Sequence, residues 1–193
     1  METIVYLIRH GETEWNQTRR IQGHSDITLN EQGLRQAEQV ARRFRGEAIQ
    51  AVYSSDLSRA RVTAMLIATE AGSTVSTLPS LRERCYGEWE GLTYEEIRSR
   101  FAAQDEAACG IETFEDMQQR AVNELTKLAR SHPNQAVVVV SHGGLINSFL
   151  HYVTGGEQGT GVTRIDNTGV TVLRYADHRW EVLQVNNTDH LKM

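Results

Sequence analysis

Three short apolar runs in the sequence have the composition of buried β-strands. They span residues 4–8, 48–53 and 136–140, are rich in β-branched residues, and are nearly continuous in their apolar character. A strand with one face in water alternates apolar and polar residues, whereas a strand covered on both faces does not need to alternate. The three runs therefore predict central strands of a sheet with helices packed on both faces.

Segments with helical periodicity lie between these runs. Leu34, Val40 and Phe44 share one face of a helix, for which Asn30 is placed as the N-terminal cap and Gly46 as the end. Further elements are expected at 57–70, 114–130 and 145–154 as helices and at 170–175 and 180–185 as an antiparallel hairpin. Strands that alternate with helices indicate an α/β protein. We expect a three-layer α/β/α sandwich with a mostly parallel sheet and an antiparallel pair towards one side.

The whole chain, residues 1–193, is expected to form one domain. Its length is sufficient to bury a substantial core without disulfide bonds, and it has no internal repeat, low-complexity stretch or linker-like segment. The periodicity is weaker at about 84–112. We expect this segment to form a small lid over one end of the sheet.

The composition argues against several kinds of partner. A formal net charge of -5 offers no general surface to a polyanion, so nucleic acid is not expected to bind. No apolar run approaches the length of a membrane span, and the first residues lack a signal-peptide pattern. Cys85 and Cys109 show neither CxxC spacing nor the number typical of a disulfide scaffold. These features indicate a cytoplasmic protein with no membrane partner, and they leave the oligomeric state open.

Arginine and histidine side chains follow the predicted strands directly. Arg9 and His10 come after the first run, His142 and Gly143 come after the third, and Arg59 lies shortly beyond the second. Ligands of open α/β sheets bind at the carboxyl ends of the strands. We therefore expect two imidazoles and two guanidinium groups to meet at one edge of the sheet.

A phosphate dianion is the ligand that fits this cluster best. The planar fork of an arginine matches phosphate oxygens and carries a permanent charge. Gly11, Gly23 and Gly143 allow backbone amides to approach an anion closely. A neutral histidine has the nitrogen lone pair that attacks phosphorus, and we expect the other histidine to be protonated and to help hold the phosphate oxygens.

A metal site is the main alternative for these histidines, since His10, His24 and His142 are able to meet in space. However, the sequence contains neither HxxxH nor HExxH. The arginines beside the histidines would also repel a cation. We therefore expect no metal ion.

Several motifs follow one another in a characteristic order. LIRHGETEWN is followed by IQGHSDITLNEQGLRQA, and then by SSDLSRARVTA, LRERCYGEWEGLT and VVVVSHGG. From Ile4 to about Tyr175 the chain resembles the histidine phosphatase superfamily, the phosphoglycerate mutase-like family, and within it the bacterial broad-specificity phosphatases with a short lid. The resemblance implies the phosphoglycerate mutase-like fold. It also implies phosphoryl transfer through phosphohistidine on a small phosphate ester, with no cofactor.

The resemblance further implies roles for single residues. His10 corresponds to the nucleophile that becomes phosphohistidine, and Glu83, within LRER, corresponds to the proton donor. The residues that match positions holding the phosphate or the substrate are Arg9, Arg59, His142, Asn16, Gln22, Gly23 and Gly143. Arg82 and Arg84 flank Glu83, and we expect their charges to oppose its action as an acid.

Three functions are compatible with these motifs. A phosphomonoesterase passes the phosphoryl group from His10 to water, whereas a phosphoglycerate mutase that depends on bisphosphoglycerate returns it to the substrate. A degenerate member of the family only binds phosphorylated ligands. Such a module is expected to lack one of His10, Glu83 and His142, and all three are present.

The segment after Glu83 favours the phosphatase over the mutase. A mutase has to retain a doubly anionic intermediate and exclude water, and family mutases carry paired arginines in this segment. Here Arg98 and Arg100 are not adjacent, and the stretch AAQDEAACGIE is acidic. Cys85 stands where the mutases have histidine, although Arg84 and Tyr86 beside it match their motif. The physiological substrate stays open.

Overall fold

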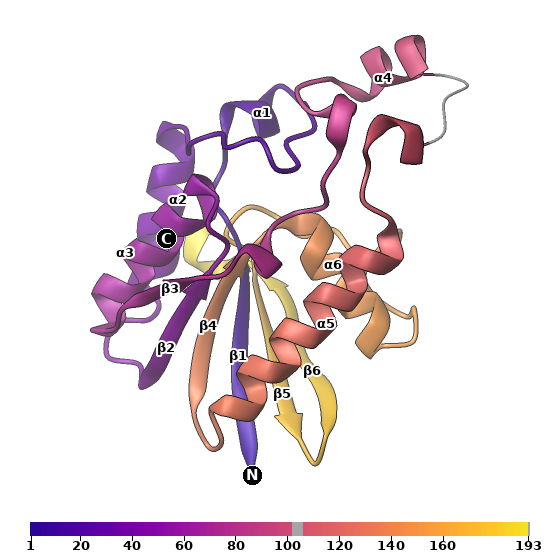
Figure 1. Ribbon diagram of the computed structural model, residues 1–193. Coiled ribbons are helices and arrows are strands. Elements are labelled where there is room, and N and C mark those ends of the chain that lie inside the picture. Colours follow the sequence, from indigo (N-terminus) through magenta and orange to yellow (C-terminus); the bar gives the residue numbers. More distant parts are fainter. Residues whose placement is uncertain (102–105, 193) are drawn as a thin grey trace.

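The computed structural model describes residues 1–101 and 106–192. The described residues form a six-stranded sheet in the order β3-β2-β4-β1-β5-β6 (Figure 1). The strands are β1 (Glu2–Arg9), β2 (Ile49–Ser54), β3 (Val75–Thr77), β4 (Ala136–Ser141), β5 (Val170–Ala176) and β6 (Arg179–Asn187). β4 is parallel to β1 and β2, β2 is parallel to β3, and β5 is antiparallel to β1 and β6. The expected mostly parallel sheet with an antiparallel pair at one side is confirmed.

Helices cover both faces of this sheet (Figure 1). The α-helices of the described residues are α1 (Glu14–Gln17), α2 (Glu31–Arg42), α3 (Ser58–Ala71), α4 (Tyr94–Phe101), α5 (Phe114–Ser131) and α6 (Gly143–Val153). Short 3-10 helices are η1 (Pro79–Leu81), η2 (Gly87–Trp89), η3 (Ala107–Cys109) and η4 (Asp189–Lys192). α2 and α3 pack together on one face of the sheet, and α5 and α6 pack together on the other. The expected three layers are therefore present.

The valines of β4 supply both halves of the core. Val137 and Val139 pack into the apolar cluster shared with α5 and α6, whereas Val138 and Val140 pack into the cluster shared with α2 and α3. All four side chains are fully buried. Successive side chains of a strand point to opposite faces, so a strand between two helical layers needs apolar residues at every position. Each burial contributes about 1.5–3 kcal/mol relative to an exposed side chain.

The helix boundaries follow the predicted signals with one difference. Asn30 Oδ1 accepts a hydrogen bond from the Gly33 amide at 2.7 Å and caps α2 as expected. The helix ends at Arg42, however, and tighter turns carry the chain on to Gly46, where φ is +76°. The elements β3, α1 and α4 were not predicted. β3 and α1 are too short for a periodic pattern to reveal them.

The segment expected to form a lid lies above the carboxyl ends of the parallel strands (Figure 1). Its described parts are η2, α4 and η3, while residues 102–105 of the expected 84–112 lie outside the described residues. Arg20, just after α1, connects this segment to the loop that follows α1. Its side chain donates to the Gly91 carbonyl and pairs with Glu96 at 2.9 Å. Among the described helices, none has both the length and the apolarity that crossing a membrane requires.

A buried histidine near the C-terminus supports the loop behind His10. His190, in η4, is 3% exposed, and its Nε2 lies 3.1 Å from the hydroxyl of Thr168. The Thr168 amide in turn donates to the Arg9 carbonyl at 3.0 Å. Burial, and then the nearby charge of Arg43, lowers the pKa of His190 to about 4. His190 is therefore neutral in the folded chain at neutral and mildly acidic pH.

We expect His190 to make the fold sensitive to acid. In the unfolded chain its imidazole binds a proton near pH 6.5, whereas in the folded chain it does so only near pH 4. The unfolded state binds more protons in this window, so stability falls as the pH falls, by at most about 1.4 kcal/mol per pH unit for this group. Urea unfolding at pH 7 and pH 5 should show a smaller acid loss for His190→Gln than for the wild type. Equal losses would show that another group causes the effect.

Candidate active site

The register of two parallel strands sets the two histidines side by side. Arg9, the last residue of β1, pairs with Ser141, the last residue of β4. The His10 amide donates to the Ser141 carbonyl at 3.0 Å, which continues the pairing one residue further. The ring centroids of His10 and His142 are consequently 5.1 Å apart. The two strand ends therefore build one site, as expected for neighbouring parallel strands.

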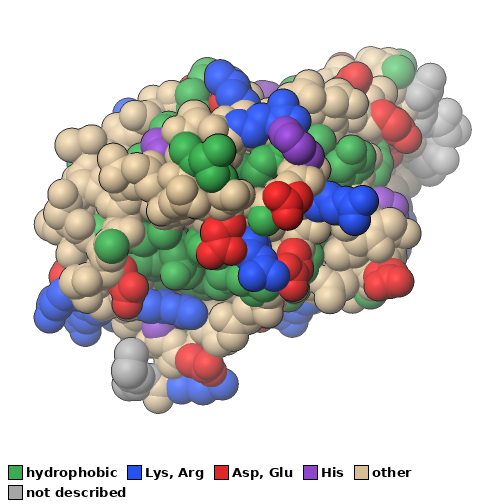
Figure 2. All heavy atoms as spheres, turned by 90° about the horizontal axis from the view of Figure 1, so that it is seen from below, with side chains coloured by type: hydrophobic (Ala, Val, Ile, Leu, Met, Phe, Trp, Pro, Cys, Tyr) green, Lys and Arg blue, Asp and Glu red, His purple; other side chains and the backbone are tan. Residues whose placement is uncertain are grey.

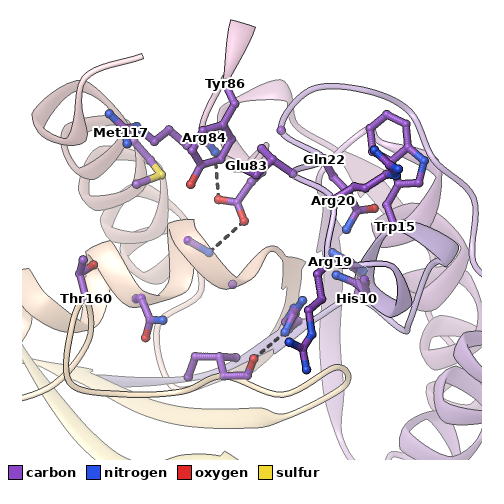
Figure 3. A pocket seen from close by; sticks show the side chains of 18 of the residues that line it. His10, Trp15, Arg19, Arg20, Gln22, Glu83, Arg84, Tyr86, Met117 and Thr160 are labelled. Carbon is purple, nitrogen blue, oxygen red and sulfur yellow. Dashed lines mark hydrogen bonds between the residues drawn. The ribbon is translucent and has the colours of Figure 1, made fainter. Parts of the chain in front are cut away.

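A cavity of about 630 Å³ lies at this edge of the sheet (Figure 3). All of the predicted site residues except His142 line it, namely Arg9, His10, Asn16, Gln22, Gly23, Arg59, Glu83 and Gly143. His142 is fully buried beside the ring of His10 and is not one of the described residues that line the cavity. Its contact with a phosphate stays a prediction.

His10 is held as a neutral imidazole with a defined tautomer. Its Nδ1 lies 2.7 Å from the carbonyl oxygen of Gly11. Because a carbonyl oxygen only accepts, Nδ1 carries the proton and Nε2 keeps its lone pair. Burial, and then the charges of Arg59 and Arg9, hold the pKa of His10 well below its usual value of 6.5. The ring is thus prepared to act as a nucleophile at neutral pH.

The surroundings of His142 also favour its neutral form when no anion is bound. Burial, and then the charges of Arg59 and the neighbouring His10 and Arg9, hold the pKa of His142 well below 6.5. Both of its ring nitrogens are buried, and they have no hydrogen-bond partner in the described part of the chain. Two arginine charges near a buried ring disfavour a third positive charge as long as no anion is bound. The protonation expected when a phosphate is bound stays a prediction.

Arg9 and Arg59 place two positive charges beside the histidines. Arg9 Nη1 donates to the Ile165 carbonyl, and Arg59 donates to the carbonyls of Ser25 and Gly23, each at 2.7 Å. Burial lowers the pKa of Arg9, and it lowers the pKa of Arg59 to about 10. A guanidinium group keeps its proton in proteins, so each carries a positive charge at neutral pH. The Nε atoms of both are buried and have no partner among the described residues. Two oriented cations bound only to carbonyls form a site for an anion.

Glu83 reaches into the cavity, where its carboxylate caps the N-terminus of α6 (Figure 3). Oε2 accepts from the Gly144 amide at 2.9 Å, and Oε1 accepts from the amides of Leu145 and Arg84 at 3.0 and 2.9 Å. A side-chain carbon at Gly144 would overlap Oε1, so the close approach requires glycine there. Among the described residues that line the cavity, Glu83 is the one carboxylate.

The two arginines that flank Glu83 have partners of their own. Arg82 forms a two-pronged pair with Asp56 at 2.7 and 2.5 Å, and Arg84 pairs with Glu106 at 2.7 Å. Each guanidinium charge is therefore largely balanced by a different carboxylate. Neither of these guanidinium groups is therefore an unpaired charge beside Glu83.

One wall of the cavity is formed by Asn16, on α1, and by Gln22 and Gly23, in the loop after it. The hydroxyl of Thr13 lies within hydrogen-bond distance of two side-chain oxygens, Asn16 Oδ1 at 3.2 Å and Gln22 Oε1 at 2.8 Å. This leaves the amide NH₂ groups to donate to a ligand. Gly23 adopts a φ of +51°, in which its carbonyl accepts from Arg59. The loop thus connects the side-chain amides of Asn16 and Gln22 to Arg59, which the Gly23 carbonyl binds.

The metal alternative finds no support in the geometry. In the ranges that the structure describes, no three side chains among His, Cys, Asp and Glu are arranged to hold a metal ion. His24, considered as a partner of His10 and His142, instead places its Nε2 2.8 Å from the backbone carbonyl of Glu83. It therefore supports the chain that carries Glu83.

Two further residues support the site, and neither is marked by a local pattern in the sequence. Arg120, on α5, donates to the carbonyls of Arg82 and Glu83 at 2.6 and 2.7 Å and holds the chain that presents the Glu83 carboxylate. Asn167 donates to the carbonyl of His10 at 3.0 Å. Both interactions join residues that lie far apart in the sequence, so only the fold reveals them.

Glu90 connects the segment above the cavity to the loop that binds Arg59. Its carboxylate accepts from the amides of His24 and Ser25 at 2.8 Å and from the amide of Tyr86 at 3.1 Å. The carbonyl of Ser25 in turn binds Arg59. Glu90 is one of three glutamates in the motif LRERCYGEWEGLT. Among them, the resemblance to the family implied a role only for Glu83.

Comparison with known proteins identifies relatives over nearly the whole chain. The family model of the histidine phosphatase superfamily (branch 1) matches residues 5–188. The uncharacterized phosphatase PhoE of Bacillus subtilis (strain 168) is 32% identical over 189 residues, which cover 98% of this chain and 97% of PhoE. The metal-independent phosphoserine phosphatase of Arabidopsis thaliana is 35% identical over 201 residues, which cover 98% of this chain and 83% of that protein.

The fold has solved counterparts of the same extent. The structure of Bacillus stearothermophilus YhfR superposes with a TM-score of 0.88 at 28% sequence identity, and the match covers 98% of this chain and 99% of YhfR. The overall fold of the chain is thus that of a known architecture.

Proposed function

The chain belongs to the histidine phosphatase superfamily, and from that membership we propose that it hydrolyses phosphate monoesters of small metabolites through a phosphohistidine, without a metal ion. One observation carries the proposal: the Nε2 lone pair of a neutral His10 faces a cavity beside two buried arginines. A relative with high coverage is a metal-independent phosphoserine phosphatase, which supports the same reaction class.

In the first step His10 accepts the phosphoryl group. Nε2 attacks phosphorus, the P–O bond of the ester breaks, and the leaving alkoxide takes a proton from Glu83. Arg9 and Arg59 bind the phosphoryl oxygens and stabilise the negative charge on them in the transition state. The binding of a dianion next to His142 opposes the effect of the arginines and favours protonation of that ring.

In the second step water releases the phosphate. A water molecule attacks phosphorus of the phosphohistidine, Glu83 takes one of its protons, and the N–P bond breaks. The products are inorganic phosphate, neutral His10 and a protonated Glu83, so the enzyme returns to its starting state. Asn16, Gln22, Gly23 and Gly143 are proposed to orient the phosphate and the substrate through amide groups.

The structure also bears on the mutase alternative. Arg84 and Tyr86 match the mutase motif and line the cavity, and the guanidinium of Arg84 stacks 5.4 Å from the centroid of the Tyr86 ring. However, Arg84 Nε donates to the carbonyl of Glu112, and Nη2 pairs with the carboxylate of Glu106. A second phosphate would have to compete with Glu106 for this guanidinium charge, which favours hydrolysis.

The setting of the proposed reaction follows from the chain as a whole. We propose that residues 1–193 act as one domain, in which the segment at about 84–112 is a lid over the cavity. We also propose that it works in the cytoplasm, where small phosphorylated metabolites are found. Nucleic acid is proposed not to be a substrate, in keeping with the net charge of -5. On the face that Figure 2 shows, acidic and basic side chains are interspersed and form no continuous basic surface.

A phosphate-release assay tests this function. The purified protein, treated with EDTA, should release inorganic phosphate from at least one ester in a panel that includes phosphoserine, 3-phosphoglycerate, sugar phosphates and p-nitrophenyl phosphate. The arginines supply the charge that a metal ion would otherwise provide, so chelation should leave the rate within about twofold. On 3-phosphoglycerate, isomer formation with a bisphosphoglycerate primer is measured in the same sample. Isomerisation well above phosphate release would establish the mutase, and activity restored only by a divalent metal would contradict the metal-free reaction.

A further inference from the structure

We propose that Arg19 binds a carboxylate of the substrate and thereby selects phosphate esters that carry one. The inference rests on the proposed phosphatase function and adds a specificity residue to its cavity. Arg19 follows α1 and lines the cavity, and its side chain extends into the cavity on the side of His10 (Figure 3).

Arg19 differs from the other arginines around the cavity in having no side-chain partner among the described residues. Arg20, Arg84 and Arg164 also line the cavity, and each pairs with a carboxylate, at 2.9, 2.7 and 2.9 Å. Arg9 is bound to a backbone carbonyl next to the histidines. In the residues that the structure describes, Arg19 takes part in no ion pair and its side chain makes no hydrogen bond. Its five donors are therefore available to a ligand.

The backbone of Arg19 is in a conformation that glycine usually provides. Its φ is +56°, directly after the C-terminal cap of α1 at Thr18. The Arg20 amide donates to the Trp15 carbonyl at 2.8 Å, and the Arg19 amide donates to the Asn16 carbonyl at 3.3 Å. These two bonds define a Schellman turn, in which the left-handed position is most often glycine. An arginine at this position costs backbone free energy, as is typical of functional sites.

The charges in the cavity favour a carboxylate over a second phosphate. Among the described residues that line the cavity, the arginines without a carboxylate partner are Arg9, Arg19 and Arg59. When Glu83 carries the proton that it gives to the leaving group, three positive charges face the ligand. A phosphate dianion with one carboxylate balances them, whereas two phosphate dianions would leave negative charge in excess.

Matched pairs of substrates isolate the contribution of Arg19. Phosphoserine carries a carboxylate that phosphoethanolamine lacks. Likewise, 3-phosphoglycerate has a carboxylate where glycerol 3-phosphate has a CH₂OH group. The readout is the preference ratio, defined as kcat/KM for the carboxylate ester divided by kcat/KM for its partner. In Arg19→Asn this ratio should fall about 10- to 100-fold, since the hydrogen bonds of a charged pair are lost. Asparagine tolerates the left-handed conformation, so the Schellman turn is retained.

The controls separate Arg19 from the general charge of the cavity and from folding. Arg164→Asn also removes one positive charge from the lining, and it should leave the preference ratio within about twofold. Arg19→Gly relieves the backbone, so its melting temperature should equal or exceed that of the wild type while the ratio still falls. Arg19→Lys should retain part of the preference.

Each alternative outcome has a distinct meaning. If the wild type hydrolyses esters but Arg19→Asn lowers both members of a pair equally, or neither, the carboxylate site is disproved and the phosphatase function stands. If fructose 1,6-bisphosphate depends on Arg19 more strongly than phosphoserine does, the second anion is a phosphate and the inference is wrong. If the wild type hydrolyses no ester in either pair or in the wider panel, the proposed function itself fails.

Discussion

Alanine in place of His10 is expected to abolish turnover of every phosphate ester that the wild type hydrolyses, by roughly 10⁴-fold or more, because no other group can form the covalent intermediate. The His10 ring has Nδ1 occupied by the Gly11 carbonyl and a pKa held well below 6.5, so Nε2 is the nucleophilic atom. Brief incubation with a ³²P-labelled substrate should label the wild type with phosphate that is stable in base and lost in acid. The variant should carry no label.

His142 provides the matched control for this experiment. It is an equally buried imidazole 5.1 Å away, but it does not line the cavity and both of its nitrogens lack a partner in the described chain. His142→Ala should slow turnover and still form the labelled adduct. A labelled His10→Ala together with an unlabelled His142→Ala would mean that the two roles are reversed. Thermal unfolding of both variants checks that each folds.

The sheet was predictable because its central strands carry an unusual pattern. In β4 four consecutive valines serve two core clusters, and such a run has few other uses in a folded chain. The caps of the longer helices were visible for the same local reason, since Asn30 accepts from an amide three residues away. By contrast, β3 has two exposed residues out of three and contributes little to the core, so its composition carried no signal.

The positions of the site residues were more predictable than their electrostatics. Adjacent parallel strands bring Arg9, His10 and His142 together by register alone. The neutrality of His142 depends on full burial and on three neighbouring charged or ring groups from other elements. Similarly, the charge of Arg84 is balanced by Glu106, which is far along the chain. Such partners are set by tertiary packing, so residues adjacent in sequence were an unreliable guide to which charges interact.

The role proposed for Arg19 could not be predicted from the sequence either. In the sequence it is one of two neighbouring arginines with no distinguishing feature. In the structure Arg20 pairs with Glu96, whereas Arg19 takes the left-handed position of a turn and extends into the cavity (Figure 3). A positive φ at a residue other than glycine or asparagine has no sequence signature, because any residue can be forced into it by its surroundings. The specificity of the site therefore had to be sought in the fold.

Glu83 is proposed to donate a proton to the leaving group. Its hydrogen bonds affect how a loss of activity in a Glu83 variant is interpreted. Both carboxylate oxygens are bound to amides at the N-terminus of α6 or next to it. In Glu83→Gln, one oxygen is replaced by an NH₂ group that has to face an amide donor, so some loosening of this end of α6 is expected. A loss of activity alone would therefore not identify Glu83 as an acid. The comparison has to be between two substrates on one protein preparation.

We expect Glu83→Gln to reduce kcat/KM for an alkyl phosphate by about 10²- to 10³-fold and that for p-nitrophenyl phosphate by about tenfold or less. The alkoxide needs a proton as the P–O bond breaks, whereas nitrophenolate is stable enough to leave without one. Any loosening of α6 affects both substrates and cancels in their ratio. The measurement is steady-state kinetics on both esters, combined with thermal unfolding of the variant. Equal losses would show that Glu83 acts by positioning α6 or by activating water, because only proton donation to the leaving group depends on which ester is cleaved.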